Sequence, residues 1–399
     1  MVVVIAGVFA FVNSLSGVWL LDDYSRIVSN RCIGEFPAVI QESTRPLVRA
    51  TFFLNYKFGR LDPSGYHAVN IVIHLLAGLT LFGLVRLTLT FRGMAEKFGG
   101  AAQILAMGVA SIWAVHPLQA SSVTYIVQRA EIMMGMFYLL TLYAIARGCR
   151  SAKPYRWYTA SIIFCACGMA SKPVMVTAPV MALLYDRAFI SGSFAKALRL
   201  RWRLYAGLCA TWVIAGVLVS APNESSTSAG YTGAAIPFAE YAMTQPEVIL
   251  HYLASVFDPH LLCFDYAWEP AGSWREAFLP SVLVGSLLLI SLAGISRRFS
   301  WGFAGVWFFL LLLPVSIVPT GDCAFDHRMY LPLAGVVGVV VAGPYSLMRN
   351  RVRPWVYGLA VCLLTGLLAW MTCGRNRVYH SEERVWREVV EKRPGNLRA

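Results

Sequence analysis

The chain has 399 residues, of which 57% are hydrophobic and only 14% charged, whereas a soluble globular domain carries about 25% charged residues. Its formal net charge is +13, but the Lys and Arg residues fall mainly in short loops between apolar segments. That distribution is typical of membrane topology and argues against nucleic-acid binding. The apolar segments are continuous and long enough to span a bilayer, so the composition predicts an all-α polytopic membrane protein and not an outer-membrane barrel.

The first apolar segment, residues 2–21, is predicted to be a retained membrane helix, because no basic stretch precedes it and no small-residue cleavage site follows it. Two adjacent carboxylates, Asp22 and Asp23, come directly after it. Carboxylates at the edge of the hydrocarbon are costly to keep charged. We therefore interpret the pair as a functional site in preference to a polar cap that marks the membrane edge.

The polar segment 22–66 is predicted to be a long outer loop. Aromatic and aliphatic side chains alternate there with Arg45, Arg49 and other cations, a pattern typical of a helix lying on the membrane surface. The acidic pair and this interfacial helix are therefore expected on the same face of the membrane.

Ten further membrane helices are predicted. Lys and Arg concentrate in alternate loops, which are expected to face the cytoplasm. This pattern predicts an inner N-terminus, an outer C-terminus and an outer acidic pair, in a bacterial inner membrane or, if the source is eukaryotic, with the pair in the lumen. The predicted helices cover about residues 67–90, 101–116, 124–146, 157–170, 173–187, 204–221, 279–296, 301–319, 329–348 and 355–373.

Polar residues inside the helix at 67–90 share one face. His67, Asn70 and His74 are spaced by three, four and seven residues, which places them together on a helix that should turn them toward the bundle interior. Hydrogen bonding between helices is the preferred interpretation, with metal binding as the alternative. Two His residues two turns apart do not chelate a metal, and no metal is expected.

Cations at three outer positions are candidates for phosphate binding. Arg129 begins one helix, with Glu131 as its expected counter-ion. Lys172 precedes Pro173 at a break between two short helices, where free backbone N–H groups favour an anion. His327 and Arg328 precede another helix. A plain ion pair or a Lys side chain that reaches to the interface is the alternative at the first two positions.

Two more outer segments complete the predicted organisation. Residues 222–278 form a second long loop, which begins with the small polar stretch 223–230 and continues into an amphipathic segment at about 248–257. Residues 374–399 follow the transmembrane domain, predicted at 1–373, and contain an amphipathic helix at about 381–393 that Pro394 ends.

The order of these motifs resembles the GT-C superfamily of membrane glycosyltransferases. It is most similar to the membrane module of the transmembrane and tetratricopeptide-repeat O-mannosyltransferases and their bacterial relatives. The chain departs from that pattern at Pro173 and His327, where many relatives carry Glu. The matching stretches are Asp22-Asp23, residues 45–55 (RPLVRATFFLN), Tyr66-His67 with Asn70 and His74, His116-Pro117 with residues 128–131 (QRAE), residues 171–186 from SKP to YD, and His327-Arg328 with residues 330–332 (YLP).

The resemblance implies inverting transfer of a sugar from a polyprenyl-phosphate donor to a hydroxyl of a protein or glycan, in contact with membrane lipids and without a cofactor. It implies Asp22 or Asp23 as the base and cations at the lipid phosphate. The tail resembles the start of a tetratricopeptide repeat. A transporter or flippase of a lipid-linked or anionic substrate, or a scaffold of an envelope assembly, is the alternative. The implied donor phosphate contacts are Arg129, Lys172, Arg328 and His327, with Arg45, Arg49, His67, Asn70, His74 and Glu131 as further candidates for substrate contact.

Overall fold

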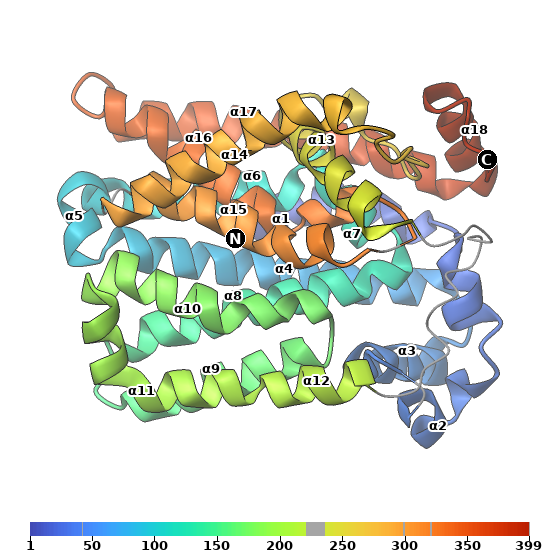
Figure 1. The fold of residues 1–399 in the computed structure, drawn as a ribbon, viewed down its shortest axis with the longest axis horizontal. Coiled ribbons are helices and arrows are strands. Elements are labelled where there is room, and N and C mark those ends of the chain that lie inside the picture. Colours follow the sequence, from blue (N-terminus) through green and yellow to red (C-terminus); the bar gives the residue numbers. More distant parts are fainter. Residues whose placement is uncertain (42, 221–235, 298–299, 320, 399) are drawn as a thin grey trace.

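The computed structural model describes residues 1–41, 43–220, 236–297, 300–319 and 321–398. In these ranges every regular element is a helix, and the longer helices run mostly along the long axis of the molecule (Figure 1). The predicted all-α polytopic fold is thereby confirmed. The small polar stretch predicted at 223–230 lies outside the described residues.

The apolar helices lie close to the predicted segments. Seven stretches within the described residues are long and apolar enough to cross a membrane, and three shorter apolar helices accompany them. The helices that match the predicted segments after the first are α4 (Pro63–Leu89), α6 (Ala102–Val115), α8 (Arg129–Gly148), α9 (Pro154–Met169), α10 (Ala178–Tyr185), α11 (Phe194–Ala210), α12 (Trp212–Ser220), α14 (Trp274–Ser296), α15 (Ser300–Ile317), α16 (Pro332–Met348) and α17 (Pro354–Asn376).

The first helix is much shorter than predicted. Helix α1 (Val2–Phe11) passes into a 3-10 turn (Val12–Ser16) and then into extended backbone at Gly17. Short polar side chains compete with the helix for backbone groups, and here Asn13 donates to the carbonyl of Cys373 at 2.8 Å. The acidic pair therefore follows an extended segment and does not lie at the end of a membrane helix.

Helix α4 lies at the centre of the bundle, where it packs against α1, α6 and α8. On α8, Gly135 allows the ring of Tyr330 to lie directly against the helix, because any Cβ at this position would collide with that ring. Tyr330 immediately follows the short 3-10 helix Asp326–Met329. The close approach thus holds that short helix, with its cations, against the start of α8.

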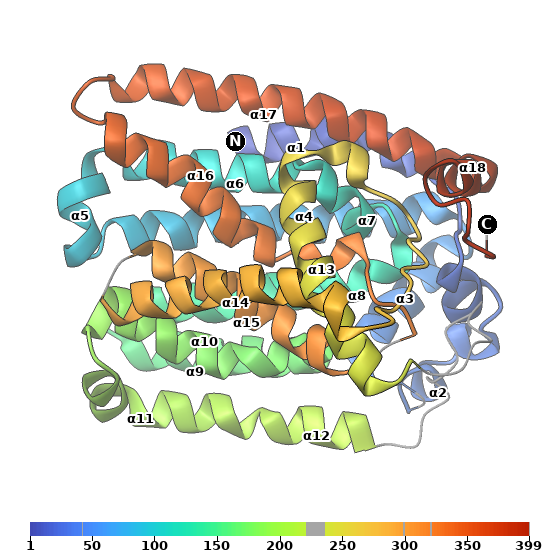
Figure 2. The ribbon, with the colours of Figure 1, turned by 45° about the horizontal axis from the view of Figure 1, so that its top comes forward.

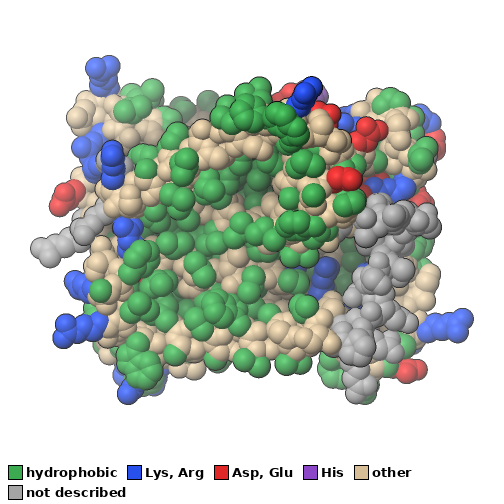
Figure 3. Space-filling model, viewed as in Figure 1, with side chains coloured by type: hydrophobic (Ala, Val, Ile, Leu, Met, Phe, Trp, Pro, Cys, Tyr) green, Lys and Arg blue, Asp and Glu red, His purple; other side chains and the backbone are tan. Residues whose placement is uncertain are grey.

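Charged side chains separate toward the two ends of the molecule. Lys and Arg gather at the end that carries α5 (Arg92–Phe98), the start of α11 and the α16–α17 connection, while the middle is mainly hydrophobic (Figures 1 and 3). This clustering agrees with the predicted alternation of basic loops. The assignment of this end to the cytoplasm stays a prediction.

The opposite end carries the predicted outer segments. The first loop forms two short helices, and the described part of the second loop forms a longer one with Pro246 inside it. Figure 2 shows α3 and α18 at this same end of the bundle. The elements here are α2 (Phe36–Gln41), α3 (Pro46–Gly59), α7 (Ala120–Val123), α13 (Phe238–Phe257) and α18 (Glu382–Lys392).

Candidate functional site

Asp23 is buried, and its hydrogen bonds join the first loop to the segment just before α8. Its carboxylate accepts hydrogen bonds from the backbone N–H of Leu20 at 3.1 Å and of Val127 at 2.8 Å. Burial raises the pKa of the Asp23 carboxyl well above its usual range, against these two hydrogen bonds, and the neighbouring Asp22 adds to the rise. With its oxygens engaged and no exposed surface, Asp23 is suited to position the loop.

Asp22 is the more accessible carboxylate of the pair. Its side chain is partly exposed, and its backbone N–H donates to the hydroxyl of Tyr125 at 3.0 Å. The preceding Leu21 has φ 38°, a left-handed conformation that costs a branched residue free energy and is concentrated at functional sites. The turn therefore presents Asp22 to the outer end of the bundle while Asp23 anchors it.

Lys172 lies at the predicted break between α9 and α10. Its backbone is extended, and a 3-10 turn (Pro173–Thr177) precedes α10. The ammonium forms an ion pair with Glu131 of α8, and both side chains are almost fully buried. Glu131 is thus the partner of Lys172, whereas the sequence predicted it to be the counter-ion of Arg129.

Arg328 is held by backbone carbonyls of its own loop. Its guanidinium donates to the carbonyl of Cys323 at 2.7 Å and to that of Asp322 at 2.9 Å. Asp326, two residues before it, accepts a hydrogen bond from Tyr266 at 2.6 Å. The arrangement fixes a buried positive charge near the Lys172–Glu131 pair, since Arg328 and Lys172 interact electrostatically.

His327 lies within the same group of cations. Its ring stacks on Phe325 with 5.0 Å between centroids. Burial lowers the pKa of His327 well below its usual range, and the neighbouring charges of Lys172, Arg328 and Arg45 lower it further. The imidazole is therefore neutral near pH 7 and able to donate or accept a hydrogen bond.

Arg45 lies near both the acidic turn at Asp22 and the group formed by Lys172, His327 and Arg328. Burial lowers the pKa of Arg45, as does the nearby Arg26, whereas Glu131 and Asp22 raise it. Within the described part of the chain its guanidinium donates no hydrogen bond. Arg45 thus brings an unengaged set of donors to a position near both Asp22 and the Lys172–Glu131 pair.

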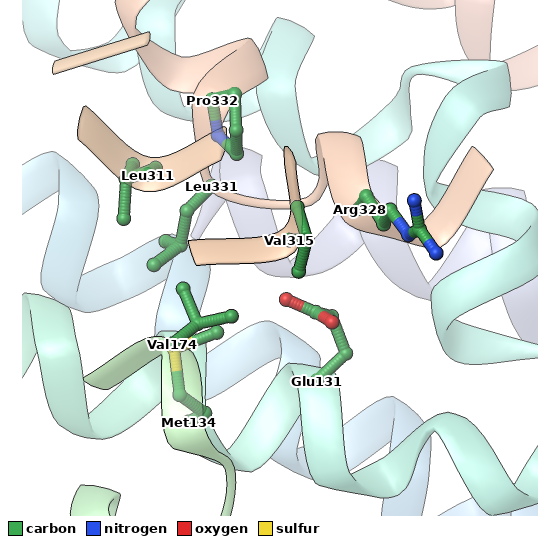
Figure 4. Close-up of a pocket in the computed structure, with 8 residues that line it drawn as sticks. All are labelled: Glu131, Met134, Val174, Leu311, Val315, Arg328, Leu331 and Pro332. Atoms are coloured by element: carbon green, nitrogen blue, oxygen red, sulfur yellow. The ribbon is translucent and has the colours of Figure 1, made fainter. Parts of the chain in front are cut away.

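A small pocket with one polar wall lies beside these charges (Figure 4). Glu131 and Arg328 supply the polar wall, while the other lining side chains are apolar and come mainly from α15 and the start of α16. The free space is about 10 Å³, room for about one water molecule. Its apolar lining is Met134, Val174, Leu311, Val315, Leu331 and Pro332.

Arg129 has a different environment from the other predicted phosphate contacts. It is fully buried, and its guanidinium donates to Asn70 at 2.7 Å, to Asn55 at 2.6 Å, to Thr51 at 3.2 Å and to the carbonyl of Tyr66 at 2.9 Å. These contacts join α3, α4 and α8. Because neutral protein groups already occupy its donors, Arg129 is suited to brace the helices beneath the site.

The polar face of α4 lies inside the bundle, as predicted. Asn70 donates to the carbonyls of Val123 and Ile126, and His74 lies 3.0 Å from the Tyr330 hydroxyl. His67 packs so closely against Gly17 that a Cβ there would come within 2.7 Å of its ring. Asn70 and His74 thus hold neighbouring segments by hydrogen bonds, in line with the interhelical interpretation, whereas the contact of His67 with Gly17 is one of packing.

Two neighbouring residues were not among the predicted site residues. Arg26 follows the acidic pair in sequence, and its carbonyl accepts a hydrogen bond from Arg49 at 2.5 Å. Tyr125 supports Asp22 from the segment before α8, and no local pattern marks it. Among the described residues, no group of three or more His, Cys, Asp or Glu side chains could hold a metal ion.

Fold and site together define a polytopic helical membrane protein with an acidic turn and a small pocket with a charged wall at one end of its bundle. Comparison with known proteins confirms the predicted relationship: the chain is similar to several proteins named protein O-mannosyl-transferases. No protein-family model matches the chain, and no solved structure matches it.

The relatives are similar at low identity. Protein O-mannosyl-transferase tmtc2 of Xenopus laevis is 32% identical over 36% of this chain and 16% of its own length. Human TMTC2 is 27% identical over 45% of this chain and 23% of its own length. Human TMTC1 is 23% identical over 98% of this chain and 51% of its own length. The chain thus spans about half or less of these relatives.

Proposed function

We propose that this protein transfers a sugar from a polyprenyl-phosphate donor to a hydroxyl acceptor, with inversion at the anomeric carbon. One observation carries the proposal: Arg45, Lys172 and Arg328 interact electrostatically with the same small group of residues, next to an apolar pocket and near Asp22. An apolar pocket with a cationic wall suits an isoprenoid chain that ends in a phosphate.

The donor phosphate would bind at the cations. As the bond between the anomeric carbon and the phosphate oxygen breaks, its electron pair stays on the phosphate, and prepositioned cations stabilise that growing charge. Arg45 has unengaged donors, while Lys172 could exchange Glu131 for the phosphate. Because the free space is about 10 Å³, entry of the lipid requires side chains of α15 such as Val315 to move.

Asp22 would act as the general base. The acceptor oxygen forms the new bond to the anomeric carbon from the face opposite the phosphate, and its proton passes to the Asp22 carboxylate. Asp23 would position this turn through its two backbone hydrogen bonds. No resident cofactor enters the proposal, because the lipid-linked sugar is the substrate and Arg and Lys meet the leaving-group charge.

The names of the relatives suggest mannose as the sugar and protein as the acceptor. An envelope glycan or lipid is the other acceptor class for a bacterial protein. We propose that the end with Asp22 faces the periplasm of a bacterial inner membrane, or the lumen in a eukaryote, because the basic loops gather at the opposite end.

The test is sugar transfer and polyprenyl-phosphate release by the full chain in membranes, with labelled polyprenyl-phosphate mannose and a hydroxyl acceptor. Asp22→Asn should lower the rate about 100-fold or more, since a general base contributes about that factor. Glu35→Gln, which removes an exposed carboxylate from the same loop, is the matched control and should leave the rate unchanged.

Equal rates for Asp22→Asn and the wild type would refute the base assignment. Movement of the intact donor across the membrane, without acceptor-dependent release of polyprenyl phosphate, would identify a flippase and refute the proposed transfer.

A further inference from the structure

A second and larger pocket lies at the outer end of α17. Its volume is about 390 Å³, and none of its lining residues lines the first pocket. Its wall comes from the end of α17, from α18 and from the turns at Pro117 and Pro259. Nothing in the proposed sugar transfer uses this pocket.

The lining of this pocket is rich in positive charge. Arg375, Arg377 and Lys392 line it together with a single carboxylate, Glu388. Glu388 pairs with both Arg375 and Lys392, the latter at 2.8 Å. Two cations therefore share one carboxylate and a third cation lies beside them, so the lining has a net positive charge even though Asp326 lies behind it.

Two guanidinium groups of the pocket lining have donors without a hydrogen-bond partner among the described residues. The Arg375 side chain is about nine-tenths buried, yet its Nη2 nitrogen has no hydrogen-bond partner in the described part of the chain. A buried donor without an acceptor carries a desolvation penalty that a bound anion would remove. Arg377 is exposed and forms no hydrogen bond or ion pair with the described residues.

The pocket adjoins an exposed apolar face of α17. Leu359, Leu363, Leu367 and Trp370 are exposed by 54%, 68%, 53% and 69%, and their spacing of four, four and three residues places them on one helical face. Trp370 is also part of the pocket lining. An exposed apolar stripe of α17 thus runs up to a cationic pocket.

We propose that this pocket binds the headgroup phosphate of an anionic phospholipid, with an acyl chain lying along the exposed stripe of α17. The phosphate would accept hydrogen bonds from Arg375 and Arg377, and Lys392 would add charge from α18. The lipid would thereby join α17 to the tail helix. This binding is independent of the proposed sugar transfer.

The experiment uses the full chain in nanodiscs with brominated lipids, which quench nearby Trp fluorescence. The signal of Trp370 is the part that Trp370→Phe removes. Brominated phosphatidylglycerol should quench this part at a lower mole fraction than brominated phosphatidylcholine. Arg377→Gln should weaken the phosphatidylglycerol effect about five-fold, since a cation near an anionic lipid contributes about that factor.

The matched control is Arg384→Gln, which removes an exposed Arg from α18 outside the pocket and should change nothing. Arg375→Gln tests the buried donor; if it fails to fold, Arg377→Gln still decides. Equal quenching by the two lipids, or equal effects of Arg377→Gln and Arg384→Gln, would overturn the proposal. Arg377-dependent binding of inorganic phosphate without phosphatidylglycerol binding would identify a free-anion site and overturn the lipid assignment.

Discussion

Replacing Arg45 by Gln should separate the proposed donor binding from folding. The Arg45 guanidinium makes no hydrogen bond within the described residues, so its loss should change the free energy of unfolding by less than about 0.5 kcal/mol, as for other substitutions outside the core network. A hydrogen bond from a cation to a phosphate contributes about 2 kcal/mol. We therefore expect kcat/KM for the polyprenyl-phosphate donor to fall about 30-fold.

Arg129→Gln is the matched comparison, because it removes an Arg with four hydrogen bonds. At about 1 kcal/mol for each bond, unfolding should become easier by about 3–4 kcal/mol, because the Oδ1 atoms of Asn55 and Asn70 lose the donor that Arg129 supplies. We expect a clearly lower Tm and yield for this variant, and little change in the donor KM of the fraction that folds.

The assay measures initial rates against donor concentration for both variants in nanodiscs, together with Tm from the loss of monomer on heating. The reasoning fails if Arg45→Gln keeps the wild-type kcat/KM. It also fails if Arg45→Gln lowers Tm as much as Arg129→Gln does, because Arg45 would then serve the fold.

The remaining predictions concern buried charges. Glu131→Gln leaves Lys172 as a buried, unpaired cation and should lower Tm strongly. The double variant Glu131→Gln with Lys172→Met should recover the wild-type Tm but not sugar transfer. A Tm of the double variant as low as that of Glu131→Gln would contradict this prediction. Burial raises the pKa of Asp326 to about 6, so its contribution to stability is complete below about pH 4 and is lost as the pH rises through 6. Asp326→Asn keeps an acceptor for Tyr266. Its free energy of unfolding should equal that of the wild type at pH 4 and be larger by at most about 3 kcal/mol at pH 8. A difference in the free energy of unfolding that does not vary with pH would refute the raised pKa of Asp326.

Local patterns predicted the apolar helices and the break at Lys172, because length, hydropathy and a Ser-Lys-Pro sequence act over a few residues. The same patterns predicted a first helix that is longer than the observed one. Asn13, in the turn that follows it, donates a hydrogen bond to the carbonyl of Cys373 near the other end of the chain, and hydropathy averaged over neighbouring residues cannot reveal so distant a partner.

The separate roles of Arg129 and Glu131 show the same limit. Two residues apart on a helix, side chains point in different directions, so Arg129 turns toward α3 and α4 while Glu131 reaches Lys172. Sequence proximity suggested an ion pair between them, and helix geometry excludes it.

The sequence alone determined that this is a helical membrane protein with an acidic pair and several cations outside its helices, since hydropathy and charge are properties of the residues themselves. Only the tertiary structure decided which of these charges meet. Asp23 is buried and accepts a hydrogen bond from Val127, which lies beside it, whereas the backbone turn at Leu21 leaves Asp22 as the more accessible acid. Arg45, Lys172 and Arg328 are far apart in sequence, and they lie near one another because the packing of the helices brings their loops together.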